Sequence, residues 1–155
     1  MSGPAVVRRA TAADAAEAAR LLDAFNREYN DPTPGVEVLT GRLAAMIGDE
    51  RIVVLLAGDG PDAVAQLAFR PSVWAEGPDL YLAELYVRPE FRGRGLGGAL
   101  LDAAIELARE RGAEIVDVVT SDDDTAAIGL YESRGLIDRE GGPGGPRMRF
   151  YEREL

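Results

Sequence analysis

Residues 82–97 have the sequence Leu82-Ala83-Glu84-Leu85-Tyr86-Val87-Arg88-Pro89-Glu90-Phe91-Arg92-Gly93-Arg94-Gly95-Leu96-Gly97. Residues 80–87 form an apolar, strand-like run in which Glu84 is the one carboxylate. From Leu96 onward the apolar residues recur every three or four positions, which predicts a helix that ends at Gly112. The stretch therefore predicts a strand, a glycine-rich turn and a helix in succession.

The turn between this strand and helix has the composition of an anion-binding loop. Its residues are Arg92, Gly93, Arg94, Gly95, Leu96 and Gly97. Glycines let the backbone bend tightly and approach a ligand, and the first amides of a helix have no intrahelical acceptor. The two arginines can add charge-assisted hydrogen bonds. A turn that only packs a helix on a sheet needs fewer glycines, so we expect this one to bind an anion.

The same glycines also fit a dinucleotide-binding fingerprint, with Asp117 at about the distance of its acidic residue. That fingerprint starts directly at the end of a strand, whereas here Pro89 and its neighbours intervene. The chain after Gly98 is also too short for the remaining mononucleotide-binding units. An NAD(P)-dependent oxidoreductase is therefore the alternative, not the main prediction.

The whole chain predicts a single mixed α/β domain over residues 1–155. Strands are expected at residues 6–9, 51–57, 63–73, 80–87, 114–120 and 148–154, and further helices at residues 12–29, 37–47 and 122–134. Short loops between the central strands predict antiparallel hairpins, and the later strand-helix-strand order predicts a crossover.

Composition excludes several kinds of chemistry. The chain has no cysteine and no histidine, so a disulfide, a thiolate metal site, a Ser-His-Asp triad and His-ligated zinc are all excluded. Any catalysis must use carboxylates, tyrosine, arginine or backbone amides. We expect no metal, and the lack of cysteine is compatible with a cytoplasmic protein.

The formal net charge of -10 disfavours nucleic acids and anionic membranes as partners and favours a cationic one. Residues 1–7 lack the features of a signal segment, and no stretch reaches the ~20 apolar residues of a membrane span. Trp74, Glu76 and the run Asp122-Asp123-Asp124 could form an aromatic and acidic mouth for a cationic acceptor. For the aspartates we favour the simpler interpretation, the start of a helix.

Residues 82–97 resemble the acetyl-CoA signature of the GNAT superfamily of N-acetyltransferases. The core of that signature is Gln/Arg-x-x-Gly-x-Gly/Ala, which Arg92, Gly95 and Gly97 match. Residues 124–136 resemble the family's Asn-x-x-Ala-x-x-x-Tyr-x-x-x-Gly-Phe segment. The resemblance implies a mixed, mostly antiparallel sheet of about six or seven strands, flanked by about four helices and splayed between strands four and five.

The resemblance also implies the residues that bind acetyl-CoA. Backbone groups of Leu85, Tyr86 and Val87 would pair with the pantetheine arm, and the amides of residues 92–97 would hold the pyrophosphate. Asp124 is at a third cofactor-binding position, where the family usually has Asn. Its acceptor-only side chain cannot reproduce the donor bonds of an amide.

Without cysteine or histidine, we expect direct attack of a small-molecule primary amine on the thioester. The amine has a pKa of about 10 and must lose a proton, either to Glu84 or to a water that Glu84 polarises. Polyamine-type relatives carry this glutamate one position earlier, at Ala83, and adjacent residues face opposite sides of an ideal strand. The family places the proton donor for the leaving thiolate at Tyr131, which could instead be a core aromatic.

Three functions remain open at this level: an N-acetyltransferase, an oxidoreductase and a non-catalytic acyl-CoA sensor. Ala83 and Asp124 depart from the residues that the family or its polyamine-type relatives carry at these positions, which would suit a non-catalytic sensor. The sequence identifies neither the acceptor amine nor the oligomeric state, for which a homodimer is one possibility.

Overall fold

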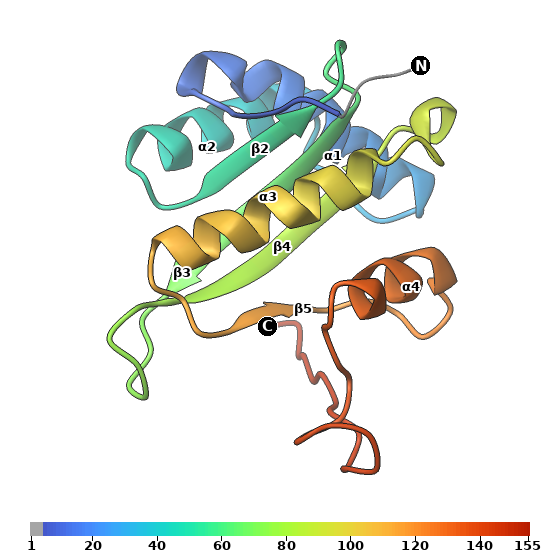
Figure 1. The fold of residues 1–155 in the computed structure, drawn as a ribbon. Helices are drawn as coiled ribbons and strands as arrows, with labels where there is room; N and C mark the ends of the chain where they lie inside the picture. Colours follow the sequence, from blue (N-terminus) through green and yellow to red (C-terminus); the bar gives the residue numbers. More distant parts are fainter. Residues whose placement is uncertain (1–4) are drawn as a thin grey trace.

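The computed structural model describes residues 5–155, which form one sheet with helices on both of its faces (Figure 1). Residues 1–4, part of the stretch considered for a signal segment, lie outside this range. The strands are β1 (Val7–Arg9), β2 (Val53–Ala57), β3 (Ala63–Arg70), β4 (Asp79–Val87) and β5 (Val116–Val118). The helices are α1 (Ala15–Glu28), α2 (Val36–Gly48), α3 (Leu96–Glu110) and α4 (Thr125–Ser133), with 3-10 turns η1 (Ala12–Asp14) and η2 (Pro89–Phe91). No described helix is both long and apolar enough to cross a membrane.

The strands follow one another across the sheet in the order β1-β2-β3-β4-β5. The first four are antiparallel neighbours, and the α3 crossover brings β5 parallel to β4. The predicted hairpins and the predicted crossover are therefore both present. Parallel strands need a long connection between them, and α3 provides it.

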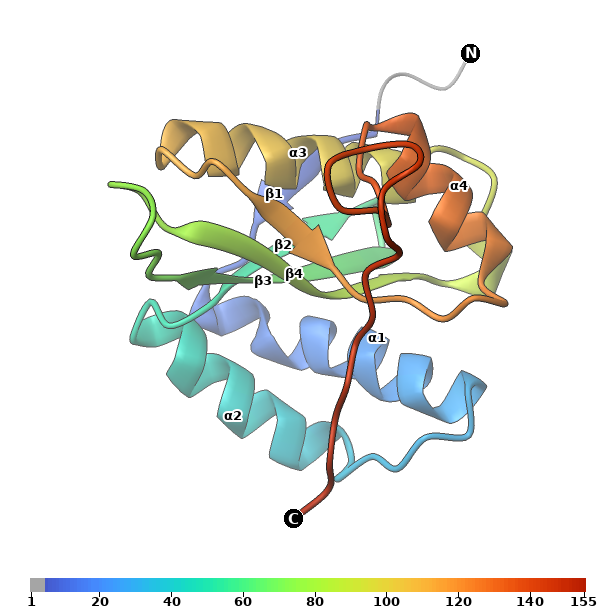
Figure 2. The ribbon, with the colours of Figure 1, turned by 90° about the horizontal axis from the view of Figure 1, so that it is seen from below.

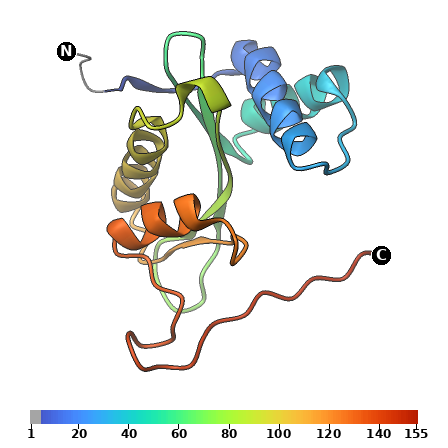
Figure 3. The same ribbon diagram turned by 90° about the vertical axis from the view of Figure 1, so that its right-hand side faces the viewer.

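The number of strands is lower than expected, because the strand predicted at residues 148–154 is absent. Five strands are formed within residues 5–155, and a single bridge between Arg139 and Arg147 precedes the carboxyl-terminal segment. That segment leaves the body of the protein as an extended arm (Figure 3). Its apolar side chains are exposed, namely Met148, Phe150, Tyr151 and Leu155. A strand-like pattern needs a neighbouring edge to become a strand, and the arm has none here.

Two cores lie on opposite faces of the sheet. Figure 2 shows α3 on one face and both α1 and α2 on the other. Alternate residues of β2 belong to different cores: Val53 and Leu55 pack under α3, whereas Val54 and Leu56 pack under α1 and α2. Every residue of β2 is buried. Burial on both faces explains why this strand is a continuous apolar run without polar alternation.

Candidate active site

A β-bulge in β4 determines the face of the sheet on which Glu84 lies. The pairing of β4 with β3 shifts there by one residue, so Ala83 has no partner of its own. An extra residue reverses the alternation of side chains along a strand. Leu82 accordingly packs in the core under α3, whereas Glu84 and Tyr86 lie on the side of α1 and α2. The rule that neighbours face opposite sides of an ideal strand does not hold across this bulge.

Glu84 lines a cavity of about 230 Å³ between α1, α2, β3 and β4. The other polar residues of its wall are Asn26, Thr33, Arg42 and Gln66. Burial raises the pKa of the Glu84 carboxyl above its ordinary value. A general base works best with a pKa close to the operating pH, so the shift has the direction that a base requires. A larger hollow of about 400 Å³ between residues 9–12 and 47–50 is more open and contains no predicted site residue.

The predicted phosphate-binding turn is an array of backbone donors. Within residues 5–155, the amides of residues 93–98 donate to no protein oxygen, and the first helical bond runs from the Ala99 amide to the Gly95 carbonyl, at 3.0 Å. Gly93 and Gly95 have φ values of 76° and 83°. Left-handed residues in such a turn direct successive N–H groups into one concave site that suits an anion. A Cβ built on Gly93 or Gly95 would meet no atom within 4 Å beyond its chain neighbours, so the turn is open to solvent on the side of these Cα atoms. The turn therefore fits a pyrophosphate.

The guanidinium of Arg92 is already engaged by other residues of the protein. Its Nη2 donates to both carboxylate oxygens of Glu28 at 2.8 Å, and its Nε donates to the Val87 carbonyl at 3.0 Å. Glu28 also accepts a hydrogen bond from the Tyr86 hydroxyl at 3.0 Å. Burial and this bond raise the pKa of Tyr86 to about 12. Arg92 thus links the turn to the end of α1. Arg94 has no ion pair within the described chain, so its guanidinium is the one available to an anion.

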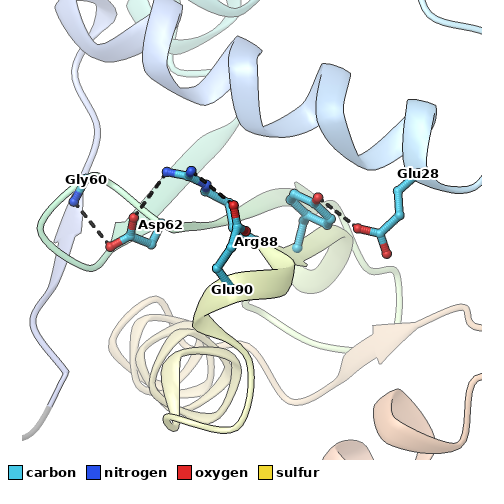
Figure 4. Close-up of polar contacts among 6 residues, drawn as sticks. Glu28, Gly60, Asp62, Arg88 and Glu90 are labelled. Atoms are coloured by element: carbon cyan, nitrogen blue, oxygen red, sulfur yellow. Dashed lines mark hydrogen bonds and ion pairs between the residues drawn. The ribbon is translucent and has the colours of Figure 1, made fainter.

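A second brace holds the segment that enters the turn (Figure 4). Asp62 is only 5% exposed, and it accepts hydrogen bonds from the Gly60 amide at 3.3 Å and from Arg88 Nη1 at 3.5 Å. The Arg88 amide also donates to the Asp62 carbonyl at 3.0 Å, and Arg88 Nη2 donates to Glu90 at 3.4 Å. The turn between β2 and β3 is thereby tied to the end of β4, directly before the predicted phosphate-binding turn.

One edge of β4 is open next to this turn. On the side of β5, pairing covers only Leu80 to Leu82, so in the described part of the chain residues 83–87 have no neighbouring strand there. This is the splay that was predicted between strands four and five. A Cβ built on Gly97 would lie 3.5 Å from Leu130 and 3.7 Å from Val87. The end of β4, the start of α3 and α4 therefore meet at Gly97.

Tyr131 lies on α4 and packs in the core under α3, with 8% of its surface exposed. Burial raises its pKa to about 12, and the charge of Asp124 adds to the rise. The Asp124 carboxylate also caps α4 by accepting a hydrogen bond from the Ala127 amide at 3.1 Å. The Tyr131 hydroxyl is therefore protonated at neutral pH and can serve as a proton donor.

The aromatic and acidic mouth suggested by the sequence does not form. Trp74 is 93% exposed, and it lies with Glu76 on the loop between β3 and β4. That loop meets the end of α3, where Gly77 abuts Gly112. Residues 122–124 follow the other end of β5 and start α4 (Figure 1). The two groups are separated because they lie at opposite ends of β5.

Three site residues were missed by the sequence analysis: Glu28, Arg42 and Gln66. Gln66 is a polar residue in an apolar strand, which is the signal that identified Glu84. Arg42 has helical spacing with the apolar residues that line the cavity beside it. Glu28 is 64 positions from Arg92 and carries no comparable signal.

The family model described as the acetyltransferase (GNAT) family matches residues 17–136. The chain belongs to this family. Membership rules out the dinucleotide-binding fingerprint as the explanation of the glycines, and it agrees with the amide array and the open edge of β4.

Several relatives extend this finding. A solved structure named as an acetyltransferase, from Arthrobacter sp. FB24, is 46% identical with a TM-score of 0.90, and the match covers 100% of this chain and 99% of that one. An uncharacterized N-acetyltransferase of Methanocaldococcus jannaschii is 42% identical over 42% of this chain and 29% of that protein. The thialysine N-epsilon-acetyltransferase of Bos taurus is 32% identical over 53% of this chain and 48% of that protein. The chain thus matches about half or less of the length of these two curated relatives.

Proposed function

We propose that this GNAT protein is an N-acetyltransferase that moves the acetyl group of acetyl-CoA to a primary amine of a small molecule. The observation that carries the proposal is the array of free amides at residues 93–98 beside the open edge of β4. The buried carboxylate of Glu84 lies on the same strand and faces a cavity. The bovine relative is named for acetylating an epsilon amine of thialysine, which supports a small amine acceptor.

Acetyl-CoA supplies the activated acetyl group, and the chain would hold it at two places. The amides of residues 93–98 and the Arg94 guanidinium suit the pyrophosphate. The backbone of residues 85–87 suits the amides of the pantetheine arm, because strand groups at an open edge lack partners. Asp124 stays a weaker candidate, since its carboxylate already caps α4.

The chain's own groups would move the protons. Glu84 takes a proton from the ammonium of the acceptor, and the free amine nitrogen then forms its bond to the acetyl carbon. The carbon–sulfur bond breaks, and the Tyr131 hydroxyl gives its proton to the departing sulfur. The nitrogen's second proton leaves as the amide forms and restores the phenol. The products are an N-acetyl amine, CoA thiol and one released proton.

Calorimetry with acetyl-CoA, together with an assay of free CoA released in the presence of a panel of amines, tests this function. We expect saturable acetyl-CoA binding, no stabilisation by NAD, and CoA release that depends on both the amine and Glu84. Binding without turnover for any amine would instead favour the acyl-CoA sensor.

We also infer that the protein works as a homodimer. The outer edge of β5 has no neighbouring strand within residues 5–155, and Ile115 and Val119 beside it are exposed. The extended arm of residues 148–155 exposes four large apolar side chains. An arm from a second copy added to this edge would satisfy its backbone groups and cover those side chains.

A further inference from the structure

The cavity that contains Glu84 carries two opposite charges on different walls. Glu84 projects from β4, and Arg42 lines the cavity from α2. Among the residues that the structure describes, no other charged side chain contributes to the wall. The site is therefore locally balanced, although the chain as a whole has a net charge of -10.

The neutral polar side chains on one wall of the cavity already make hydrogen bonds within the protein. Asn26 Nδ2 donates to the Pro32 carbonyl at 2.7 Å, and Thr33 Oγ1 donates to the Asp23 carboxylate at 2.6 Å. These bonds fix the loop between α1 and α2 that closes this side of the cavity. Asp23 is itself satisfied, because Arg27 Nε also donates to it at 2.7 Å.

Arg42 differs from these groups because its guanidinium has no partner. Within residues 5–155 it makes no ion pair and no side-chain hydrogen bond. Its neighbours on the wall from α2 are the apolar side chains of Leu39, Leu43 and Met46. A guanidinium presents a planar set of donors that matches a carboxylate in two-point geometry.

We propose that the acceptor carries a carboxylate as well as its amine, and that Arg42 binds the carboxylate while Glu84 receives the amine. This inference rests on the proposed acetyltransferase function. The substrate class is then a free amino acid or a molecule of that size and charge. A cavity of about 230 Å³ is smaller than the ~300–1,000 Å³ of pockets for drug-sized ligands, which suits such an acceptor.

The charges of Glu84 and Arg42 should influence the choice of acceptor more than the net charge of the chain does. Exposed carboxylates farther than about 8–10 Å away are largely screened by physiological salt. Arg42 is itself solvent-exposed at the wall of the cavity, but a direct contact with a bound acceptor is screened less than these distant charges. The acidic run at residues 122–124 lies at the start of α4, and the cavity is bounded by α1, α2, β3 and β4. The preference for cationic acceptors suggested by the net charge is therefore replaced by a preference for zwitterions.

Matched pairs of amines test this inference: lysine against cadaverine and ornithine against putrescine, which differ only by the carboxylate. Free CoA release would give kcat and KM, and calorimetry without acetyl-CoA would give the affinity of each amine. The variant Arg42→Met keeps most of the unbranched apolar stem of the side chain and removes the guanidinium and its charge. Arg109→Met on the exposed face of α3 removes the same charge far from the cavity and serves as the control.

We expect the parent protein to favour the carboxylate-bearing member of each pair by about tenfold or more in kcat/KM. Arg42→Met should abolish this preference, mainly through KM and binding affinity, and Arg109→Met should keep it. Equal use of both members, or an Arg42→Met variant with the parent's preference, would overturn the inference and leave the acetyltransferase function intact. If no amine releases CoA, both the inference and the proposed function fail.

Discussion

Glu84 is a residue at which activity and stability should respond in opposite directions. Replacing it by glutamine removes the base but keeps the size of the side chain, so kcat/KM should fall by about 10²-fold or more at neutral pH. The remaining activity should rise toward alkaline pH, where more of the amine is already deprotonated. The control is Glu110→Gln, on an exposed turn of α3, for which the pH–rate profile should match the parent.

The stability effect of the same Glu84→Gln change follows from the raised pKa of the carboxyl. Below the unfolded-state pKa of about 4.3, Glu84 is protonated in both states and carries no penalty. As the pH rises through the raised folded-state pKa, the parent protein loses stability because a charge is then buried. Glu84→Gln should therefore gain stability over the parent between acid and neutral pH, as measured by urea unfolding at several pH values. An unchanged difference across this range would show that Glu84 is solvated.

Tyr131 should matter for the chemical step, in which the CoA sulfur leaves the acetyl group, and not for the binding of acetyl-CoA. Tyr131→Phe deletes the hydroxyl and keeps the buried ring, so kcat should drop by about 10²-fold with little change in acetyl-CoA affinity. Because the phenol pKa is about 12, this activity loss should be the same across neutral pH. Single-turnover kinetics and calorimetry on one sample would separate the two effects. Full turnover in the phenylalanine variant would leave Tyr131 with a packing role only.

At the scale of elements, the start of α3 contains two glycines that should respond differently to alanine. Gly95 is left-handed, and a non-glycine residue there costs about 1–2 kcal/mol of folding stability. Its Cβ would also project into open space at the turn, where the pyrophosphate is proposed to bind, so acetyl-CoA binding should weaken beyond detection by calorimetry. Gly97→Ala is the matched control, because its Cβ would make ordinary contacts at 3.5 and 3.7 Å. Parent-like affinity in Gly95→Ala would remove the turn from the binding site.

The ion pair of Glu28 with Arg92 joins α1 to the turn that is proposed to bind phosphate. Because Arg92 is engaged there, Arg92→Ala should affect acetyl-CoA affinity mainly through the position of the turn. A double-mutant cycle of Glu28→Ala and Arg92→Ala, measured by unfolding, should give a coupling of about 0.5–1 kcal/mol. Glu28→Ala should then weaken acetyl-CoA binding nearly as much as Arg92→Ala does. A zero coupling energy would mean that the pair does not brace the turn.

At the scale of the whole molecule, the proposed homodimer depends on the carboxyl-terminal arm. Removing residues 148–155 should halve the native mass measured by light scattering, because β5 would lose the strand supplied by the second copy. Acetyl-CoA affinity should be retained, since the amides of residues 93–98 lie beside the end of β4 and not at the outer edge of β5. A parent protein that is monomeric at all concentrations would refute this assembly.

Several features of the protein were determined by the sequence alone because they depend on neighbouring residues. The glycines of residues 93–97, the helical period after Leu96 and the apolar runs of β2 to β4 are local patterns. A left-handed glycine and a helix amide without an acceptor follow directly from such patterns. The α/β class, the order of the elements up to α4 and the glycine-rich turn between β4 and α3 were therefore predictable.

Other features were decided only by the tertiary structure, because they depend on residues far apart in the chain. The bulge at Ala83 arises from pairing between two strands, so the position of Glu84 could not be read from β4 alone. Likewise, the engagement of Arg92 by Glu28 and the presence of Arg42 and Glu84 in one cavity wall require α1 and α2 to pack on the sheet. The same reason explains the arm: an alternating sequence specifies an extended conformation, but the edge that it joins is set by the rest of the assembly.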